Sequence, residues 1–581
     1  MPQDDFKPKL GRIRDSARTR LPSFKQQALR QAGKAGARAR WQTGHIAPRG
    51  LSRGMGAGVR AASGLIAPGS RRVIVKARYT RIVGGNLGAA RAHLGYIQRD
   101  GVTRDGAAGQ LYDRDRDQAD DGAFLERSGS DPHQFRFIVS AEDSPRLADL
   151  KPFVRDLMRQ MERDLDTQLD WVAVDHFNTG HPHTHIVIRG KDDRGQDLVM
   201  ARDYIGHGVR ARAQTLITLE LGRETDLERL KKLHNEVDQE RLTRLDRALL
   251  ARAKEGVLVV PAQADHDTAQ HALRIGRLKR LERLGLAEQR QTGVWQLDVR
   301  MESKLRQLGE RADKLKMMQR ALAEAGIDRA ASQMALFEKR PRKQPLIGKV
   351  VGVGMVDEIT DRTWVIVDAV DGRVHYAELG RLKPDDVPVR GMLAALGGDS
   401  LQDKPTAVPK LHVLSPVDPQ RHVAYDGPTW LDEAIIAKWQ PEPGLRGMAA
   451  DLRATIAARA TWLADQQLTK VGADGTVTPL PGMMSELRRR ETDRLVKDLS
   501  KHLGAEFMPA TNGSRLSGIY DRAISTPTGK IAVIRREDTF SLAPWKPALE
   551  PMRGRAVTAT LGPNRVTWTL DRGRGLPPRG T

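Results

Sequence analysis

The chain has 581 residues, a formal net charge of +23 and 39% hydrophobic residues, which is enough for several hydrophobic cores. Its sequence has neither a run of about 18 apolar residues nor a signal-peptide core, so we expect a cytoplasmic protein without membrane insertion. The absence of cysteine excludes disulfides and thiolate metal sites, and leaves His, Asp and Glu as possible metal ligands.

Much of the positive charge lies at the start of the chain. The first 72 residues contain 16 Lys and Arg against 3 Asp and Glu, so 16 − 3 = +13 of the net charge lies there. Because large apolar residues are scarce, we expect residues 1–71 to form a disordered arm. Such an arm suits the phosphate backbone of nucleic acids; the alternatives are a solvated segment or a mitochondrial-like presequence.

The next stretch predicts an α+β domain over residues 72–225. The expected elements are a strand over 72–79, a helix over 87–98, a surface loop over 104–132, a strand over 134–140 and an amphipathic helix, capped by Ser144, that runs to about 169. An antiparallel sheet with helices on one face fits this order.

A histidine cluster follows. Of 15 histidines in the chain, four fall between residues 176 and 185, and apolar runs over 169–174 and 186–188 predict strands on either side. Turn residues over 178–180 join these strands into a β-hairpin.

The hairpin predicts a metal site. His183 and His185 are two residues apart and share one face of a strand, and closure of the hairpin brings His176 beside them. Three imidazoles suit a divalent metal and leave coordination positions open for a substrate. His181 lies in the turn, where it would be a second-shell residue or a substrate contact. The alternative is a histidine cluster without metal.

Two motifs resemble those of a known family. Residues 92–101, Ala-His-Leu-Gly-Tyr-Ile-Gln-Arg-Asp-Gly, resemble the nucleophile motif of conjugative relaxases, and His176 with six residues before His183-Thr184-His185 resembles their metal motif. The chain thus resembles a relaxase of the HUH endonuclease superfamily, of the branch that includes the agrobacterial border endonuclease and plasmid mobilisation proteins. The family has a hydrophobic residue where Thr184 stands. The likeness is specific for residues 72 to about 225 and weaker beyond.

The resemblance implies a chemistry. Tyr96 would attack a phosphodiester at an origin of transfer, remain attached to the 5′ end, and later rejoin the strand. A divalent metal, Mg²⁺ or Mn²⁺, held by His176, His183 and His185 would polarise the scissile phosphate.

Supporting roles are assigned to three further residues. His181 is a candidate general base, Asp175 a second-shell carboxylate that orients a metal ligand, and Ser140 a residue near the cleavage site. The competing nucleophiles are Tyr79, Tyr112 and Tyr204.

Residues 240–300 predict a winged-helix-like DNA-binding module. A basic helix over 269–284 would enter a DNA groove, and a hairpin over 290–297 would touch the backbone. The basic residues are Arg274, Arg277, Lys279, Arg280 and Arg283. The alternative is a solvated charged helix in a protein-interaction module.

The remaining segments carry less information. We expect a helical linker over 301–344, a small β-barrel over 345–416, a helical region over 430–503 and a strand-rich region with a basic tail over 515–581. By analogy with relaxases, the partners would be single-stranded and duplex DNA, accessory relaxosome proteins, a coupling protein and a type IV secretion channel, and the protein would be translocated with the DNA.

Two other functions stay open. A rolling-circle replication initiator would use the same chemistry, but no phosphate-binding Gly-x-x-x-x-Gly-Lys-Ser/Thr loop of a helicase occurs, and the long extension favours DNA transfer. A non-enzymatic DNA-binding regulator would use the basic arm and the winged helix alone.

Overall fold

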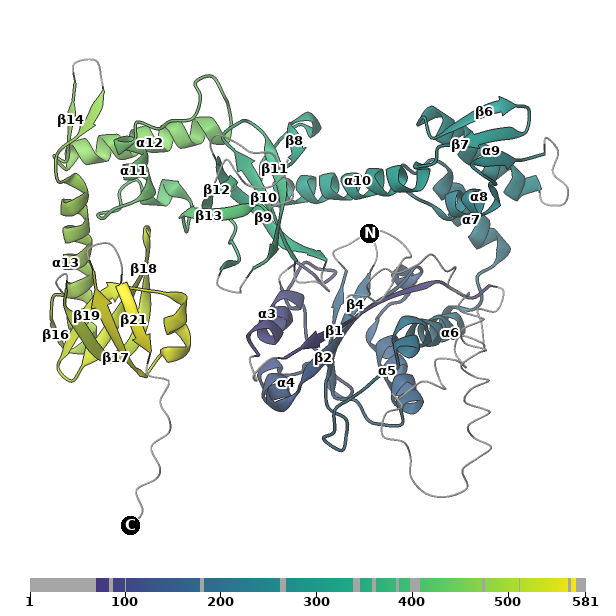
Figure 1. Cartoon of the computed structure of the whole chain (residues 1–581), viewed down its shortest axis with the longest axis horizontal. Helices are drawn as coiled ribbons and strands as arrows, with labels where there is room; N and C mark the ends of the chain where they lie inside the picture. The colour runs from purple at the N-terminus through teal and green to yellow at the C-terminus, as the bar shows by residue number, and fades with distance from the viewer. Residues whose placement is uncertain are drawn as a thin grey trace, which may run out of the picture. The chain divides into compact units, whose positions relative to one another are not determined.

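The structure is a computed structural model, and the chain is divided into two compact units, Met1–Asp313 and Lys314–Thr581 (Figure 1). It describes residues 69–82, 87–99, 101–177, 182–261, 268–337, 345–357, 362–382, 386–397, 408–472, 476–510, 513–562 and 566–570. These ranges confirm a mixed α+β protein. None of the helices within them has the length and apolar character needed to cross a membrane. The predicted basic arm and basic tail lie almost entirely outside the described residues.

The first unit is built on a four-stranded antiparallel sheet. Its strands are β1 (Val73–Arg81), β2 (His133–Ala141), β3 (Trp171–His176) and β4 (His183–Arg189), in the order β1-β2-β4-β3. The register places His176 opposite His183, and Val174 opposite His185. The predicted hairpin is therefore present as β3 and β4.

Helices cover both faces of this sheet, so the expectation of helices on one face is wrong. On one face, α5 (Lys151–Leu165) and α6 (Val209–Leu221) pack on a core that includes Trp171 and Ala173. On the other, α3 (Gly88–Ile97) and α4 (Asp121–Arg127) pack on Val172 and Val174, as Figure 1 shows. The first four residues of β3 are all buried, so both faces of this strand need a cover.

Two boundaries differ from the prediction. The expected loop over 104–132 contains α4, and the expected long helix begins only at Lys151. Ser144 lies in a separate 3₁₀ turn (Ser144–Arg146), and its hydroxyl donates to the carbonyl of Pro182 at 2.9 Å instead of capping the helix.

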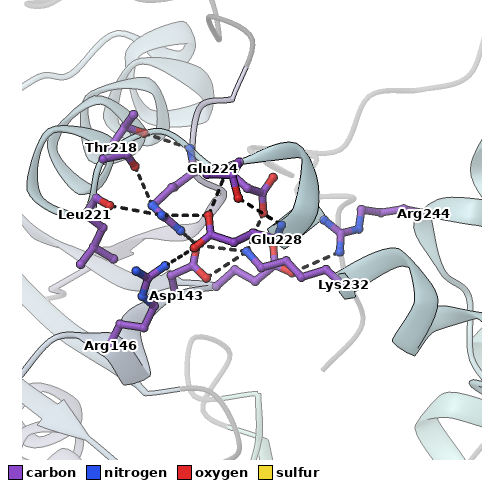
Figure 2. A network of polar contacts seen from close by, with 12 residues as sticks. Asp143, Arg146, Thr218, Leu221, Glu224, Glu228, Lys232 and Arg244 are labelled. Atoms are coloured by element: carbon purple, nitrogen blue, oxygen red, sulfur yellow. Dashed lines mark hydrogen bonds and ion pairs between the residues drawn. The ribbon is translucent and has the colours of Figure 1, made fainter. Parts of the chain in front are cut away.

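A polar network joins the end of this domain to α7 (Asp226–Val237), as Figure 2 shows. The guanidinium of Arg71 donates to Asp143 at 2.8 Å and to the carbonyl of Gly222 at 2.7 Å, and it approaches Glu228 at 3.3 Å. Lys232 of α7 lies 2.9 Å from Asp143. Because Arg71 and Asp143 are buried, the network holds β1, the end of β2 and α7 together.

The first unit ends in a small helical module with a three-stranded sheet. Its elements are α8 (Arg244–Arg252), β5 (Val257–Val259), α9 (Thr268–Arg283), β6 (Ala287–Gln291) and β7 (Val294–Leu297). The strand order is β5-β7-β6, and Trp295 is the largest fully buried side chain of its core. The predicted helix and hairpin are present, and β5 is an addition.

The second unit contains two six-stranded sheets. The first is preceded by α10 (Met301–Glu324) and consists of β8 (Met334–Leu336), β9 (Leu346–Asp357), β10 (Arg362–Ala369), β11 (Val374–Arg381), β12 (Leu393–Gly397) and β13 (Lys410–Ser415). Because β8 pairs with β11, the expected helical linker over 301–344 is wrong at its end.

The second sheet follows a further set of helices. These are α11 (Trp430–Ile436), α12 (Met448–Asp465) and α13 (Met483–Leu503), with a hairpin of β14 (Thr469–Val471) and β15 (Val477–Pro479) before α13. The region over 430–503 is thus not purely helical. The sheet itself consists of β16 (Glu506–Phe507), β17 (Arg515–Thr526), β18 (Gly529–Arg536), β19 (Thr539–Pro544), β20 (Ala556–Leu561) and β21 (Val566–Leu570).

Candidate metal centre

Three histidines converge on the α3 side of the central hairpin. His176 ends β3, and His183 and His185 lie on the facing strand β4. One ring nitrogen from each lies within 4.8 Å of those of the other two, and all three side chains are buried. Neighbouring ring centroids are 4.4 to 5.3 Å apart. The sequence predicted this convergence from the alternation of side chains along a strand.

A backbone hydrogen bond orients one of these rings. Nε2 of His176 lies 2.7 Å from the carbonyl oxygen of Ile97. A carbonyl can only accept, so Nε2 carries the proton and Nδ1 is the nitrogen able to ligate a metal. Metal-binding histidines commonly donate their second N–H to a backbone carbonyl in this way. Ile97 directly follows Tyr96 on α3, so the same bond ties the tyrosine-bearing helix to the cluster.

The donor set fits a divalent metal. Three imidazoles in mutual reach can occupy one side of a coordination sphere and leave the other side to a substrate oxygen. Nitrogen donors favour Mn²⁺ and later transition metals over Mg²⁺, which prefers oxygen. His176, His183 and His185 would hold the ion.

Tyr96 lies on the same side of the sheet as the histidines. Helix α3 is fixed there by Leu94 and Ile97, which are buried against β3 and β4. Tyr96 is half-buried, and the guanidinium of Arg99 lies over its ring, 4.0 Å from the centroid. Arg99 also donates to the carbonyl of Tyr96 at 3.1 Å.

The competing tyrosines lie on the opposite side of the sheet. Tyr112 and Tyr204 are buried in the core beneath α5 and α6, and Tyr79 packs against that core. Burial, together with the charge and hydrogen bond of Asp175, raises the pKa of Tyr112 well above its usual value. Among the tyrosines that the structure describes between residues 69 and 225, Tyr96 is the one on the histidine side.

Asp175 does not join the histidines. It precedes His176 on β3 and therefore points to the other face, where its carboxylate accepts from Tyr112 at 2.9 Å and from Thr184 at 2.5 Å. Burial raises its pKa to about 6, although both hydrogen bonds act in the opposite direction. The expected role of orienting a metal ligand is wrong. The Thr184 hydroxyl lies on this same face, where it meets the Asp175 carboxylate.

Ser140 lies on the histidine face but contacts the chain itself. Ile138, two residues before it, pairs with His185, and the Ser140 hydroxyl donates to the carbonyl of Pro182 at 3.1 Å. Ser140 thus fixes the chain where it enters β4 and presents His183. The expected base, His181, lies outside the described residues.

A fourth histidine approaches the cluster from α3. His93 is buried, and its ring centroid is 6.5 Å from that of His185. Sequence reasoning missed this residue, although its spacing of three to Tyr96 places both on adjoining parts of one helical face.

The five basic residues of α9 are not equivalent. Arg277 is fully buried and bonds both carboxylate oxygens of Asp246, so its expected contact with DNA is wrong. Lys279 and Arg283 are exposed. Arg280 bridges to Glu240 at 2.6 Å, and Arg274 donates to Gln270 at 3.2 Å.

Comparison with other proteins gives one family match, which lies in the C-terminal part of the chain. No curated protein and no solved structure is found to match it. A family described as protein of unknown function (DUF3363) matches residues 274–408 and 399–577, which together span more than half of the chain. The protein therefore belongs to the DUF3363 family.

Proposed function

We propose that the protein is a metal-dependent DNA relaxase that nicks one strand at an origin of transfer by attack of Tyr96. The main support for this proposal is the hydrogen bond that joins His176 of the buried histidine cluster to Ile97, the residue after Tyr96. A buried cluster of three imidazoles linked to a helix with a half-buried tyrosine is a combination suited to phosphoryl transfer.

The reaction would proceed by in-line displacement. The Tyr96 phenol oxygen forms a bond to phosphorus as the bond from phosphorus to the 3′ oxygen breaks, so the protein is left on the 5′ end. The phenol loses its proton, and the leaving 3′ oxygen gains one. A divalent metal on His176, His183 and His185 would stabilise the charge on the non-bridging phosphate oxygens.

The cellular setting follows from this chemistry. A tyrosine-linked strand keeps the energy of the phosphodiester, so the protein can pilot the strand into a recipient cell and rejoin it there. Accessory relaxosome proteins, a coupling protein and a type IV secretion channel would be its partners. The enzyme would act in the bacterial cytoplasm before translocation.

The test is a covalent adduct assay. The full chain is incubated with single-stranded oligonucleotides from the DNA upstream of its gene, with Mn²⁺ or Mg²⁺, and adducts are scored on a denaturing gel. We expect an adduct with wild type, none with Tyr96→Phe and none with His183→Ala/His185→Ala. Tyr112→Phe, which removes a hydroxyl from the other face of the sheet, is the matched control and should retain the adduct.

Other outcomes would assign other functions. An adduct that survives Tyr96→Phe would move the nucleophile elsewhere. Metal-independent DNA binding without any adduct would favour a non-enzymatic regulator.

A further inference from the structure

The chain from residue 243 to residue 570 presents the same succession of elements twice. A helix capped by threonine is followed by a second helix, a β-hairpin, a long helix and a six-stranded sheet. The first succession comprises α8, α9, β6–β7, α10 and β8 to β13, and the second α11, α12, β14–β15, α13 and β16 to β21. In the described residues, β5 has no counterpart in the second.

The two sheets have one topology. Their orders are β13-β12-β9-β10-β11-β8 and β21-β20-β17-β18-β19-β16. In each, the strand after the long helix adds in parallel to the third strand of the meander, and all other pairs are antiparallel. Gly348 pairs with Ala394, and Gly518 with Val557. A Cβ on either glycine would lie 2.5 Å from a carbonyl oxygen of the next strand.

The two helical parts share one buried polar cluster. Its members are Thr243, Asp246 and Arg277 in the first and Thr429, Asp432 and Arg459 in the second, and all six are buried. In both, the threonine N–H donates to the aspartate at 2.7 Å, and the arginine bonds both aspartate oxygens. Each arginine also donates to three alternate carbonyls, those of 237, 239 and 241 or of 423, 425 and 427.

Buried apolar residues repeat with constant spacing. The two arginines are 459 − 277 = 182 residues apart. The same offset relates four further buried pairs, Leu281 and Leu463, Leu286 and Leu468, Met301 and Met483, and Leu305 and Leu487. Identical residues at one offset, on equivalent elements, are difficult to obtain by convergence on a common topology.

We infer that residues 243–415 and 429–570 are two copies of one unit, and that only the first copy contacts duplex DNA. This division rests on the proposed DNA function. Residues 243–300 hold 11 Lys and Arg against 7 Asp and Glu, a net of 11 − 7 = +4. The equivalent residues 429–482 hold 5 against 6, a net of 5 − 6 = −1. Contact with DNA phosphates needs a net positive charge, which residues 243–300 have and residues 429–482 lack.

The difference is concentrated on the exposed face of the second helix. Lys279 and Arg283 of α9 are exposed, and the 182-residue offset places Thr461 and Asp465 at their positions on α12. Both of these residues are exposed too. The second copy thus keeps the buried cluster that builds the module and lacks the cations that would hold a DNA backbone.

The two sheets differ at the positions that pack against helices. Ile347 and Leu393 of the first sheet pack against α11 and α12 of the second copy. Their counterparts in the second sheet are Ser517 and Ala556, and the Ser517 hydroxyl bonds that of Thr558 at 3.0 Å. At these two positions the second sheet thus lacks the large apolar side chains that the first sheet packs against helices.

The test exchanges the exposed residues between copies in the full chain. Lys279→Thr/Arg283→Asp gives the first copy the residues of the second, and Thr461→Lys/Asp465→Arg does the reverse. Thr492→Lys/Asp498→Arg on α13 adds the same +3 charge and is the matched control. Affinity for a fluorescein-labelled 30-base-pair duplex is measured by anisotropy over a series of salt concentrations.

Each variant has a defined expectation. The first-copy exchange should weaken binding and flatten the dependence of log K on log salt by about 2, because two phosphate contacts are lost. The second-copy exchange should strengthen binding and steepen that dependence by more than the control does. A second-copy exchange equal to the control, or a first-copy exchange without effect, would overturn the inference. Adduct formation on single-stranded oligonucleotides tests the relaxase proposal independently, since it does not use these residues.

Discussion

Asp175 and His176 are neighbours in the chain, yet their side chains serve opposite faces of β3. The carboxylate of Asp175 accepts hydrogen bonds from Tyr112 and Thr184, away from the metal ligands. Asp175→Ala would leave two buried hydroxyls without an acceptor and lower the free energy of unfolding by about 1–3 kcal/mol. Urea unfolding measures this loss. Metal binding should persist in Asp175→Ala. If a folded variant no longer bound metal, Asp175 would be a part of the metal site after all.

The histidine cluster predicts metal-dependent stability. A metal that binds only the folded chain raises the melting temperature by mass action. We expect Mn²⁺ to raise the melting temperature of wild type and of Tyr96→Phe, and to leave His183→Ala/His185→Ala unchanged. Differential scanning calorimetry after removal of metal by a chelator provides the measurement. An equal rise in the double variant would place the metal elsewhere.

At the scale of residues, the sequence predicts which side chains share a face, because side chains alternate between the two faces of a strand. The convergence of His176, His183 and His185 follows from strand periodicity, but the role expected for Asp175 did not apply that periodicity, which places its side chain on the other face. The bond from His176 to Ile97 could not be predicted, because any residue offers a backbone carbonyl. Burial of Arg277 was also hidden, since its charge is typical of a surface.

At the scale of elements, the buried network around Arg71 makes stability depend on pH. Burial would raise the pKa of Asp143, but hydrogen bonds from Lys232 and Arg71 outweigh it and lower that pKa. The stability that the carboxylate contributes is therefore present above its unfolded pKa of about 3.9 and is lost as the pH falls through the lower folded value.

Asp143→Asn tests this network. At pH 7 the variant should lose about 3 kcal/mol, because buried Arg71 loses its nearest charged partner and keeps only the longer contact to Glu228 at 3.3 Å. The difference from wild type should shrink below about pH 4, where the carboxylate of the unfolded wild type takes up a proton, and disappear once the folded carboxylate is also protonated. Urea unfolding at several pH values measures both. A difference that stays constant down to pH 3 would exclude the carboxylate as the cause.

The duplicated clusters predict equivalent losses in two places. Arg277→Leu leaves Asp246 buried without its partner, and Arg459→Leu does the same to Asp432, at a cost of about 3–5 kcal/mol each. Limited proteolysis should open residues 240–300 in the first variant and 422–503 in the second. Arg283→Leu, which removes an exposed arginine from the same helix as Arg277, should behave as wild type. If Arg283→Leu lost as much stability as Arg277→Leu, the loss could not be attributed to the buried ion pair of Arg277 and Asp246.

The sequence predicts elements where the hydrophobic periodicity is strong, and it fails where only a few apolar side chains mark the buried face. The sequence predicts the strands of the first sheet, but it predicts a loop where α4 lies, because the seven residues of α4 carry only two buried side chains, Phe124 and Leu125. For the second copy, the sequence predicts only a helical region over 430–503 and a strand-rich region over 515–581. Its likeness to the first is clearest at buried positions, while exposed positions such as Arg283 and Asp465 differ in charge.

At the scale of the whole molecule, positive charge and the candidate metal centre lie in different segments. Residues 1–68 hold 14 Lys and Arg against 3 Asp and Glu, a net of 14 − 3 = +11. The histidines and Tyr96 lie after this segment. Charge should therefore govern how tightly DNA is held, and the metal centre whether a strand is cut.

Deletion of residues 1–68 separates the two contributions. Each phosphate neutralised on single-stranded DNA contributes about −0.7 to the slope of log K against log salt. The deleted chain should bind a single-stranded oligonucleotide more weakly at low salt and with a slope shallower by several units, while saturating oligonucleotide restores the wild-type yield of Tyr96 adduct. Anisotropy at several salt concentrations and the denaturing gel measure the two quantities. An unchanged slope would show that the arm does not contact DNA, and a loss of adduct at saturation would place part of the arm in the site.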